Sequence, residues 1–371
     1  MGQTALEAFN LSLLAPNGLR RGRTTGSCAT AAVKAALGLL LRGEHCTQIN
    51  VTLPDDIHFL AVPIQNLRWL DPRTVCAKVL KDGGDDPDNT HGATIFAEVR
   101  RNDIGQIRFF AGRGVGTATQ PGLRVAVGEP AINPVPRRMM TGVVEELAVA
   151  AGVAPDFRIT VSVRDGARLA EKTWNPRLGI LGGLSILGTT GIVIPYSCSA
   201  WIHSIHRGID VARAMGLTHV VGSTGDLSEK AAMARLGLPH EAYLDMGDFV
   251  GGMLKYLKAH PVERVTIAGG FGKLAKLADG ALDLHSARSS VDVQSLVNIL
   301  QNLGASPYIV ARAAEAESAN AVLQIAEAEA LGLAEIVALR ARDAAQRMVG
   351  DAVRVDVLIV DRSGAIVGES G

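Results

Sequence analysis

The chain has 371 residues, of which 47% are hydrophobic and 20% charged, and its 37 lysines and arginines balance its 37 aspartates and glutamates. This length predicts two domains, and the composition is that of a folded protein and excludes a disordered one. A neutral chain has no overall basic field for nucleic acid or an anionic membrane, so an acidic ligand must be bound by local arginines.

The four cysteines lie far apart and form no CxxC pair, which favours a reducing, cytoplasmic location. The N-terminus shows no targeting signal, because its arginines follow the apolar stretch instead of preceding it. Residues 178–202 contain no charged side chain, but glycines and Pro195 interrupt them. This segment therefore predicts buried turns and strands and not a membrane span.

The first half of the chain opens with a predicted helix over residues 27–42, with Ser27 as its N-cap and Gly43 at its end. Short β-rich stretches separated by Pro, Gly and Asp follow, which is typical of an α+β domain. The expected strands are 49–53, 75–80, 94–100, 106–110 and 158–163, and a further helix is expected over 137–151.

In the second half, helices alternate with short apolar strands, which predicts a mainly parallel sheet with helical crossovers. The expected strands are 218–222, 264–268 and 353–360, the expected helices are 199–215, 228–236, 248–259 and 290–304, and the Ala-rich segment 311–349 predicts two more helices interrupted near Gly332. We therefore expect two domains, an α+β domain over residues 1–175 and an α/β domain over residues 176–371.

The densest polar cluster is an Asp-rich loop, residues 81–92, which holds four aspartates within seven residues. Crowded carboxylates can raise one another's pKa, so Asp85, Asp86 and His91 are candidate acid/base residues. The alternative is a solvated turn in which Asp and Asn side chains bond to their own backbone. The spacing does not match a calcium-binding loop.

Two further segments of the first half could bind a ligand. Residues 21–27 contain two arginines and two threonines and run up to the start of the first predicted helix. Helix N-termini of this kind bind carboxylate or phosphate. A capping motif without any ligand is the alternative. The glycine-rich loop 112–122, which residues 127–138 follow, could let the backbone approach a ligand. It matches neither a dinucleotide-binding nor a P-loop fingerprint, so a plain turn without a ligand explains it equally well.

In the second half, two predicted strands end in loops, at residues 222–226 and 269–272. The carboxyl ends of strands in an open α/β sheet form the usual ligand crevice, although these segments could also be ordinary connections. Lys273 lacks the following Ser or Thr of a Walker A loop, which disfavours an NTPase. His203 and His206 have no third ligand nearby, so no protein-bound metal is predicted.

Six segments, in this order, resemble those of one family: RRGRTTGSCATAAVKAAL, KDGGDDPDNTHGA, GRGVGTATQPGL, VGEPAINPVPRRM, KTWNPRLGILGGLSILGTTGIVIPYS and GGFGKLAKLADG. The family is that of the cobalt-precorrin-5B C(1)-methyltransferases. The resemblance runs from about Leu19 to about Val291 and covers the Ala-rich C-terminal part poorly. The family commonly has Gly-His before Gly-Lys-Leu where this chain has Gly270 and Phe271, so no role of that histidine is carried over.

The resemblance implies an enzyme of cobalamin biosynthesis that transfers a methyl group from S-adenosylmethionine to carbon 1 of cobalt-precorrin-5B, giving cobalt-precorrin-6A. The implied partner is a small tetrapyrrole with many acetate and propionate groups, which carries the cobalt itself. No nucleic acid, membrane or protein-bound metal is implied, and the chain could form a homo-oligomer. We expect the macrocycle to lie between the two halves, because domain interfaces hold large pockets.

The candidate residues fall into three groups under this interpretation. The acid/base candidates are Asp85, Asp86 and His91. The candidates for binding S-adenosylmethionine are Gly222, Ser223, Thr224, Gly225, Asp226, Gly269, Gly270 and Gly272. The candidates for binding the tetrapyrrole are Arg21, Arg23, Thr24, Thr25, Arg113, Glu129, Asn133, Arg137 and Arg177.

Two other functions are compatible with the residues alone. The glycine loops and the helix start at Ser27 also fit an ATP-dependent small-molecule kinase, which would bind Mg-ATP. The arginine-rich segments also fit a non-enzymatic tetrapyrrole-binding carrier, which would bind the macrocycle without any affinity for S-adenosylmethionine.

Overall fold

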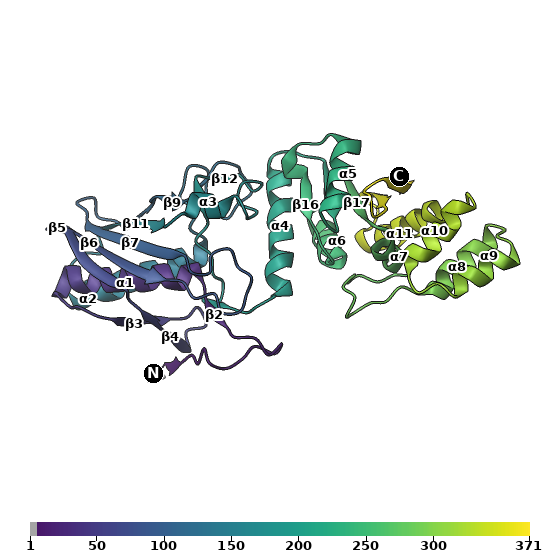
Figure 1. Cartoon of the computed structure of the whole chain (residues 1–371). Coiled ribbons are helices and arrows are strands. Elements are labelled where there is room, and N and C mark those ends of the chain that lie inside the picture. Colours follow the sequence, from purple (N-terminus) through teal and green to yellow (C-terminus); the bar gives the residue numbers. More distant parts are fainter. Residues whose placement is uncertain (1–5) are drawn as a thin grey trace. The chain divides into compact units, whose positions relative to one another are not determined.

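The computed structural model describes residues 6–371, and the chain forms two compact units, Met1–Ser197 and Cys198–Gly371 (Figure 1). The sequence predicts a boundary between residues 175 and 176, ahead of three short strands that pair within the first unit. These pairs are β12 (Ile180–Leu181) with β10 (Thr117–Ala118), β13 (Gly183–Leu184) with β9 (Gly114–Val115), and β14 (Ile192–Val193) with β2 (Gly22–Arg23). Backbone pairing thus keeps these residues in the first unit.

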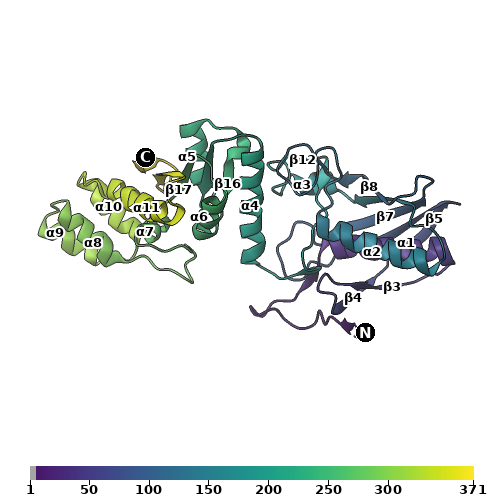
Figure 2. The same cartoon turned by 180° about the vertical axis from the view of Figure 1, so that it is seen from behind.

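The first unit contains a five-stranded sheet with the order β5-β6-β7-β11-β8, antiparallel except for the β11–β8 pair. The strands are β5 (Asn66–Asp71), β6 (Thr74–Leu80), β7 (Thr94–Arg101), β11 (Phe157–Val163) and β8 (Arg108–Ala111). A smaller sheet contains β1 (Glu7–Ala8), β4 (His58–Pro63) and β3 (Gln48–Thr52). Figures 1 and 2 show α1 (Thr25–Arg42) and α2 (Pro134–Ala150) together along one face of the larger sheet.

Helix α1 is buried along almost its whole length, with 15 of its 18 residues shielded from solvent. Its alanines let the sheet and α2 approach closely, so the helix forms the centre of the core. The helix begins two residues before the expected start at Ser27, because Thr24 is the N-cap and its Oγ1 accepts a hydrogen bond from the Ser27 N–H at 3.1 Å. Gly43 ends the helix as expected, with a φ of 70° that glycine adopts without strain.

The second unit contains a five-stranded sheet with the order β16-β15-β17-β18-β19, in which the first four strands are parallel and β19 is antiparallel. The strands are β15 (His219–Ser223), β16 (Tyr243–Asp245), β17 (Arg264–Gly270), β18 (Arg354–Val360) and β19 (Ile366–Ser370). This topology confirms the predicted mainly parallel sheet, and the α+β first unit confirms the predicted mixed fold class. Strand order reverses between β15 and β17, so the connections that leave their carboxyl ends lead to opposite sides of the sheet.

Helices cover both faces of this parallel sheet. They are α4 (Cys198–Ala214), α5 (Asp226–Leu236), α6 (Val250–Ala259), α7 (Phe271–Ala278) and α11 (Leu333–Val349). The helices α8 (Val293–Asn302), α9 (Pro307–Ala314) and α10 (Ala319–Ala328) pack on one another and on α7 and α11. Alternate strand residues point to opposite faces. Val220 and Val265 therefore pack in the core that includes α4, α6, α7 and α11, whereas Val221 and Ala268 pack in the core that includes α5.

Several elements escape the sequence analysis because local signals are weak or short. Strand β5 is largely exposed and carries polar residues, β19 follows a tight turn, and α7 begins directly where β17 ends. Gly332 does precede α11, and Ser318 caps α10. Residues 178–202 hold β12, β13, β14 and the start of α4, and no helix among residues 6–371 is long and apolar enough to cross a membrane.

Candidate active site

Three segments that are far apart in the sequence meet at the N-terminus of α1. The Asp-rich loop (residues 81–92) packs so closely on β2 that a methyl group on Gly22 would overlap the backbone of Gly83. On another side, the Gly26 N–H donates a hydrogen bond to the Leu187 carbonyl at 2.7 Å. The structure therefore joins the predicted arginine-threonine segment and the predicted Asp-rich loop into one site.

Arginines neutralise the near side of the Asp-rich loop. The Arg20 guanidinium lies 2.6 Å from the Asp82 carboxylate, and the Arg20 N–H donates to Asp85 Oδ2 at 2.7 Å. The Arg23 N–H donates to the Asp82 carbonyl at 2.7 Å. The hydrogen bond from Arg20 is the main reason that the pKa of Asp82 lies below its ordinary value.

A buried ion pair holds the far side of the loop. Lys81 is 1% exposed, and its Nζ lies 2.5 Å from Asp88 Oδ2. Burial alone would raise the pKa of Asp88, but the Lys81 charge and hydrogen bonds from Thr90 lower it below its ordinary value. The expectation that crowding raises carboxyl pKa values is thus wrong for Asp82 and Asp88, because cations offset the repulsion.

Each of the three acid/base candidates is held by a backbone amide. Asp85 accepts the hydrogen bond described above, and Asp86 Oδ1 accepts one from the Tyr196 N–H at 2.9 Å. His91 Nδ1 accepts from the Gly83 N–H at 3.2 Å, so the neutral ring carries its proton on Nε2. The structure therefore brings all three into one loop with fixed side-chain orientations, while His91 stays half exposed.

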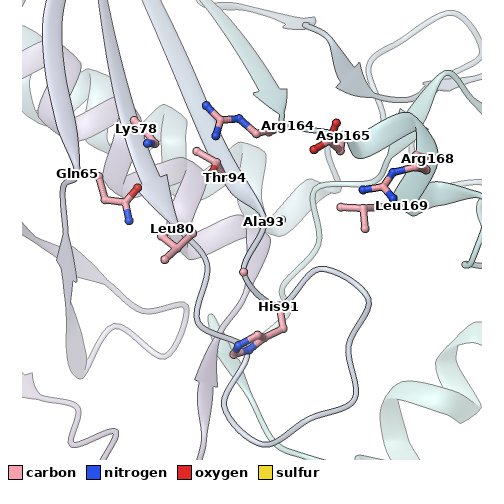
Figure 3. A pocket seen from close by; sticks show the side chains of 11 residues that line it. Gln65, Lys78, Leu80, His91, Ala93, Thr94, Arg164, Asp165, Arg168 and Leu169 are labelled. Atoms are coloured by element: carbon pink, nitrogen blue, oxygen red, sulfur yellow. The ribbon is translucent and has the colours of Figure 1, made fainter.

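His91 also lines a pocket of about 460 Å³ at one end of the five-stranded sheet (Figure 3). The other residues that line this pocket are Gln65, Lys78, Leu80, Gly92, Ala93, Thr94, Arg164, Asp165, Arg168 and Leu169. None of these ten is a candidate from the sequence, because they come from the ends of four strands, from the Asp-rich loop and from the short helix after β11, and they carry no common motif. The strand register, such as the pairing of Leu80 with Thr94, brings the strand ends together.

Two predicted tetrapyrrole-binding arginines have unsatisfied donors beside the Asp-rich loop. The Nε atoms of Arg21 and Arg23 are buried and have no hydrogen-bond partner among residues 6–371. Arg21 stacks over the Phe9 ring at 5.6 Å, and Arg23 Nη1 lies 3.9 Å from Asp82 Oδ2. Buried orphan donors on cations suit an anionic ligand such as a carboxylate.

The two predicted threonines already have partners within the protein. Thr24 Oγ1 caps α1 and donates to the Gly191 carbonyl at 3.2 Å. Thr25 Oγ1 donates to the Leu187 carbonyl at 3.1 Å and accepts from the Leu187 N–H at 2.8 Å. These bonds hold the segment from Leu187 to Gly191 against the helix N-terminus, so the threonines shape the site through its backbone.

The other tetrapyrrole candidates lie along the following segments of the first unit. Glu129 and Arg137 form an ion pair at 3.0 Å, and the Asn133 N–H donates to the Ile186 carbonyl at 3.1 Å. Arg113 is exposed, and Arg177 stacks on a tryptophan ring at 4.8 Å. Among residues 6–371, no group of three or more His, Cys, Asp or Glu side chains is placed to hold a metal ion.

The predicted loops of the second unit meet at the carboxyl ends of β15 and β17. The Thr224 N–H donates to the Ala268 carbonyl at 2.9 Å, and a Cβ on Gly269 would lie 2.9 Å from Thr224 Cγ2. Lys273 Nζ donates to the Thr224 carbonyl at 3.0 Å and also lies 3.0 Å from Asp248 Oδ1. The two loops form one edge at the point where the strand order reverses.

Among the residues described, this edge holds a buried polar atom without a hydrogen-bond partner and two glycines with free space beside them. Ser223 is 1% exposed, and its Oγ has no hydrogen-bond partner within the described part of the chain. A Cβ on Gly225 or on Gly270 would meet no atom within 4 Å, so there is room beside the N-termini of α5 and α7. Asp226 is exposed at the first position of α5.

Comparisons with known proteins match both ends of the chain. A family model described as CbiD matches residues 13–195, and a model described as CbiD, C-terminal domain, matches residues 283–371, where the resemblance from sequence motifs is poor. The chain is 57% identical to the cobalt-precorrin-5B C(1)-methyltransferase of Rhodospirillum rubrum over 95% of this chain and 98% of that protein.

Two further relatives carry the same name. The one from Paramagnetospirillum magneticum is 54% identical over 95% of this chain and 98% of its own length, and the one from Brucella anthropi is 52% identical over 94% and 95%. A crystal structure of a cobalamin biosynthesis protein from Archaeoglobus fulgidus is 28% identical, with a TM-score of 0.40 over 73% of this chain and 83% of that one.

Proposed function

The chain belongs to the CbiD family and is a cobalt-precorrin-5B C(1)-methyltransferase of cobalamin biosynthesis, and we propose that its methyl donor is S-adenosylmethionine and its product cobalt-precorrin-6A. The observation that supports the family most strongly is the 57% sequence identity to the Rhodospirillum rubrum protein over 95% of this chain. The donor supplies an electrophilic methyl group on a sulfonium, so the protein must mainly align two substrates.

The donor binds at the carboxyl ends of β15 and β17 in this proposal. Three observations support a fit: the orphan Ser223 Oγ, the room beside Gly225 and Gly270, and the exposed Asp226 carboxylate at the start of α5. Helix amides there suit the carboxylate of the donor, and Asp226 suits its hydroxyl or amino groups. A switch point of an open parallel sheet is the usual place for such a ligand.

The tetrapyrrole acceptor binds to the first unit, at the N-terminus of α1. The buried Nε atoms of Arg21 and Arg23 would bind its carboxylates, and the neutral overall charge of the chain makes such local cations necessary. The ion pairs of Arg20 and Lys81 with the Asp-rich loop fix the loop next to these arginines. The loop can then keep one orientation toward the bound ring.

His91 and Asp86 handle the proton that is released when the acceptor carbon is alkylated. The hydrogen bond from Gly83 to Nδ1 leaves His91 Nε2 as a donor while the ring is neutral, so His91 can bind a carboxylate or carbonyl of the ring. One carboxylate oxygen of Asp86 accepts a hydrogen bond from the Tyr196 N–H, and the other oxygen can accept a proton. Asp85 lies beside it on the same loop.

Calorimetric titration of the purified protein with S-adenosylmethionine and S-adenosylhomocysteine tests the donor, with Mg-ATP as the control. Saturable binding of both sulfur ligands and none of ATP is expected. Binding of ATP alone would overturn the choice of donor and favour a kinase. Methylation of cobalt-precorrin-5B at carbon 1, followed by mass spectrometry, tests the reaction directly.

Two substitutions test where the donor binds. Asp226→Asn and Ser223→Ala should each weaken S-adenosylhomocysteine binding, by about tenfold for Asp226, because a charge-assisted hydrogen bond is lost. Glu317→Gln and Ser204→Ala are matched controls in the same unit, since Glu317 is exposed between α9 and α10 and Ser204 is partly exposed on α4. Unchanged affinity in both test variants would overturn this donor site without affecting the assignment of the reaction.

We also place the enzyme in the cytoplasm. All four cysteines are free, with Cys28 and Cys76 buried, Cys46 half buried and Cys198 exposed. A chain with four unpaired thiols suits a reducing compartment. Fractionation of the source cells with detection of the protein would test this location.

A further inference from the structure

The pocket beside His91 is built from the ends of neighbouring strands in the five-stranded sheet. Lys78 lies near the end of β6, Thr94 begins β7, and Arg164 directly follows β11 (Figure 3). Gln65 precedes β5, and its N–H donates to the Lys78 carbonyl at 2.8 Å. Paired strands hold these backbones in fixed register, so the spacing of the side chains is set by the sheet and not by a mobile loop.

The pocket concentrates positive charge that the protein does not neutralise. Lys78, Arg164 and Arg168 face a single carboxylate, that of Asp165, and within residues 6–371 none of these four side chains forms an ion pair. Arg164 is held over the Phe96 ring, with its Cζ at 5.8 Å from the ring centroid. Unpaired cations around a concave surface attract an anion with more than one negative charge.

The segment that carries the two arginines is fixed by close backbone packing. A methyl group on Gly166 would overlap the backbone of Gly114, and α3 (Gly166–Ala170) packs on β9 and β13. Asp165 enters this short helix with a φ of 55°, an uncommon conformation for a residue other than glycine. Arg164 and Arg168 are therefore held at the two ends of a rigid turn.

We propose that this pocket binds the peripheral carboxylate groups of the tetrapyrrole through Lys78, Arg164 and Arg168, an inference that rests on the proposed function. Its volume of about 460 Å³ suits one edge of a large ring with its acetate and propionate groups. His91 belongs both to the pocket and to the Asp-rich loop, so an edge bound here lies next to the acid/base candidates. The three side chains orient the ring, and they are not catalytic residues.

The test measures kcat and KM for cobalt-precorrin-5B with Lys78→Gln, Arg164→Gln and Arg168→Gln. Each variant should raise KM about tenfold while kcat changes less than about twofold, because a charge-assisted contact to a remote part of the substrate is lost. Arg158→Gln is the matched control, since Arg158 lies on the same strand β11 and also stacks on an aromatic ring, Phe110, at 4.0 Å. Thermal melting checks that the variants fold.

A stable ligand pair separates this pocket from the reaction itself. Cobyrinic acid, a corrin with free carboxylates, should bind to the wild type and at least tenfold more weakly to Arg164→Gln, whereas its fully esterified form should bind both equally. An unchanged KM in all three variants, or equal binding of acid and ester, overturns the pocket assignment. Inorganic phosphate that binds to the wild type but not to Arg164→Gln, while cobyrinic acid binds to neither, overturns it in favour of a phosphate site.

The experiments distinguish a failure of the proposed function from a failure of the pocket assignment. A wild-type enzyme that does not methylate cobalt-precorrin-5B contradicts that function, and the comparison of cobyrinic acid with its ester still decides what the pocket binds. A wild type that binds neither corrin overturns the pocket assignment, whatever the activity.

Discussion

Lys81 and Asp88 form an ion pair under the Asp-rich loop, with Nζ 2.5 Å from Oδ2 and the lysine side chain 1% exposed. Lysine is almost never buried to this extent without a partner, so the pair explains how the loop can lie on the core. The loop then reaches the N-terminus of α1, where its backbone packs on that of β2. The candidate acid/base residues therefore stand on a fixed loop and not on a mobile one.

Removing the lysine charge should destabilise the first unit. Lys81→Met leaves the Asp88 carboxylate without its cation, and breaking a buried pair in this way costs about 3 kcal/mol in the free energy of unfolding. Urea denaturation measures this loss, and the double variant Lys81→Met with Asp88→Leu should recover much of it. The exposed pair of Arg73 with Asp103 is the control, because Arg73→Ala should cost less than about 1 kcal/mol.

Stability should also fall in acid because of Asp88. Its pKa in the folded protein lies below the ordinary value of 3.8, so the ionised form contributes stability above that pH and loses it as the pH falls through the folded value. Urea midpoints at pH 7 and near pH 3 should differ less in Asp88→Asn than in the wild type. Asp103→Asn should show the full wild-type difference, and an equal pH dependence in both variants would contradict the role of Asp88.

The sequence predicts most long elements of this fold, because their apolar periodicity and caps are local. Helix α1 and strands β7 and β17 were expected within a few residues of where they lie. Strands were expected within residues 178–202, but the bounds of β12 and β13 could not be predicted, since these strands exist through pairing with β10 and β9. For the same reason the predicted domain boundary lies earlier in the chain than the boundary in the structure.

The candidate site could be predicted only where its residues are neighbours in the sequence. Asp85, Asp86 and His91 stand out because they share one loop, and the glycine loops stand out because they follow predicted strands. Lys78 and Arg164 show no such signal, because the sheet register alone places them around one pocket. Tertiary contacts also place Arg20 and Lys81 beside the aspartates, so the sequence could not predict that the pKa values of Asp82 and Asp88 are lowered.

The close contact of β2 with the Asp-rich loop should make Gly22 irreplaceable. Gly22→Ala places a methyl group on the Gly83 backbone, so the loop must move, and we expect a loss of about 2 kcal/mol or more in unfolding free energy together with reduced activity. Gly142→Ala is the control, because a Cβ there meets no atom within 4 Å in the exposed middle of α2, and it should stabilise by up to about 1 kcal/mol. Equal stability of both variants would show that the loop does not pack as described.

The thiol of Cys28 should report on opening of this site. Burial raises its pKa to about 12, and the nearby Lys81 charge offsets only part of that rise, so the thiol is protonated and shielded at pH 8. Iodoacetamide at this pH should label the exposed Cys198 and leave Cys28 unlabelled until urea unfolds the first unit, as followed by peptide mass spectrometry. Labelling of Cys28 in the native wild type at the rate of Cys198 would contradict the tight packing at α1.

The proton role of the loop can be separated from its structural role. Asp86→Asn keeps an oxygen for the Tyr196 N–H but cannot accept a proton, so kcat for methyl transfer should fall about 100-fold while the melting temperature stays unchanged. His91→Ala removes both the donor at Nε2 and the hydrogen bond from Gly83, and it should lower kcat and raise KM together. Asn89→Ala is the control on the same loop, since its side chain donates a hydrogen bond to the Lys172 carbonyl at 2.8 Å. Normal kcat and KM in both Asp86→Asn and His91→Ala would place proton removal elsewhere, for example on solvent, and would leave the loop with the task of orienting the ring.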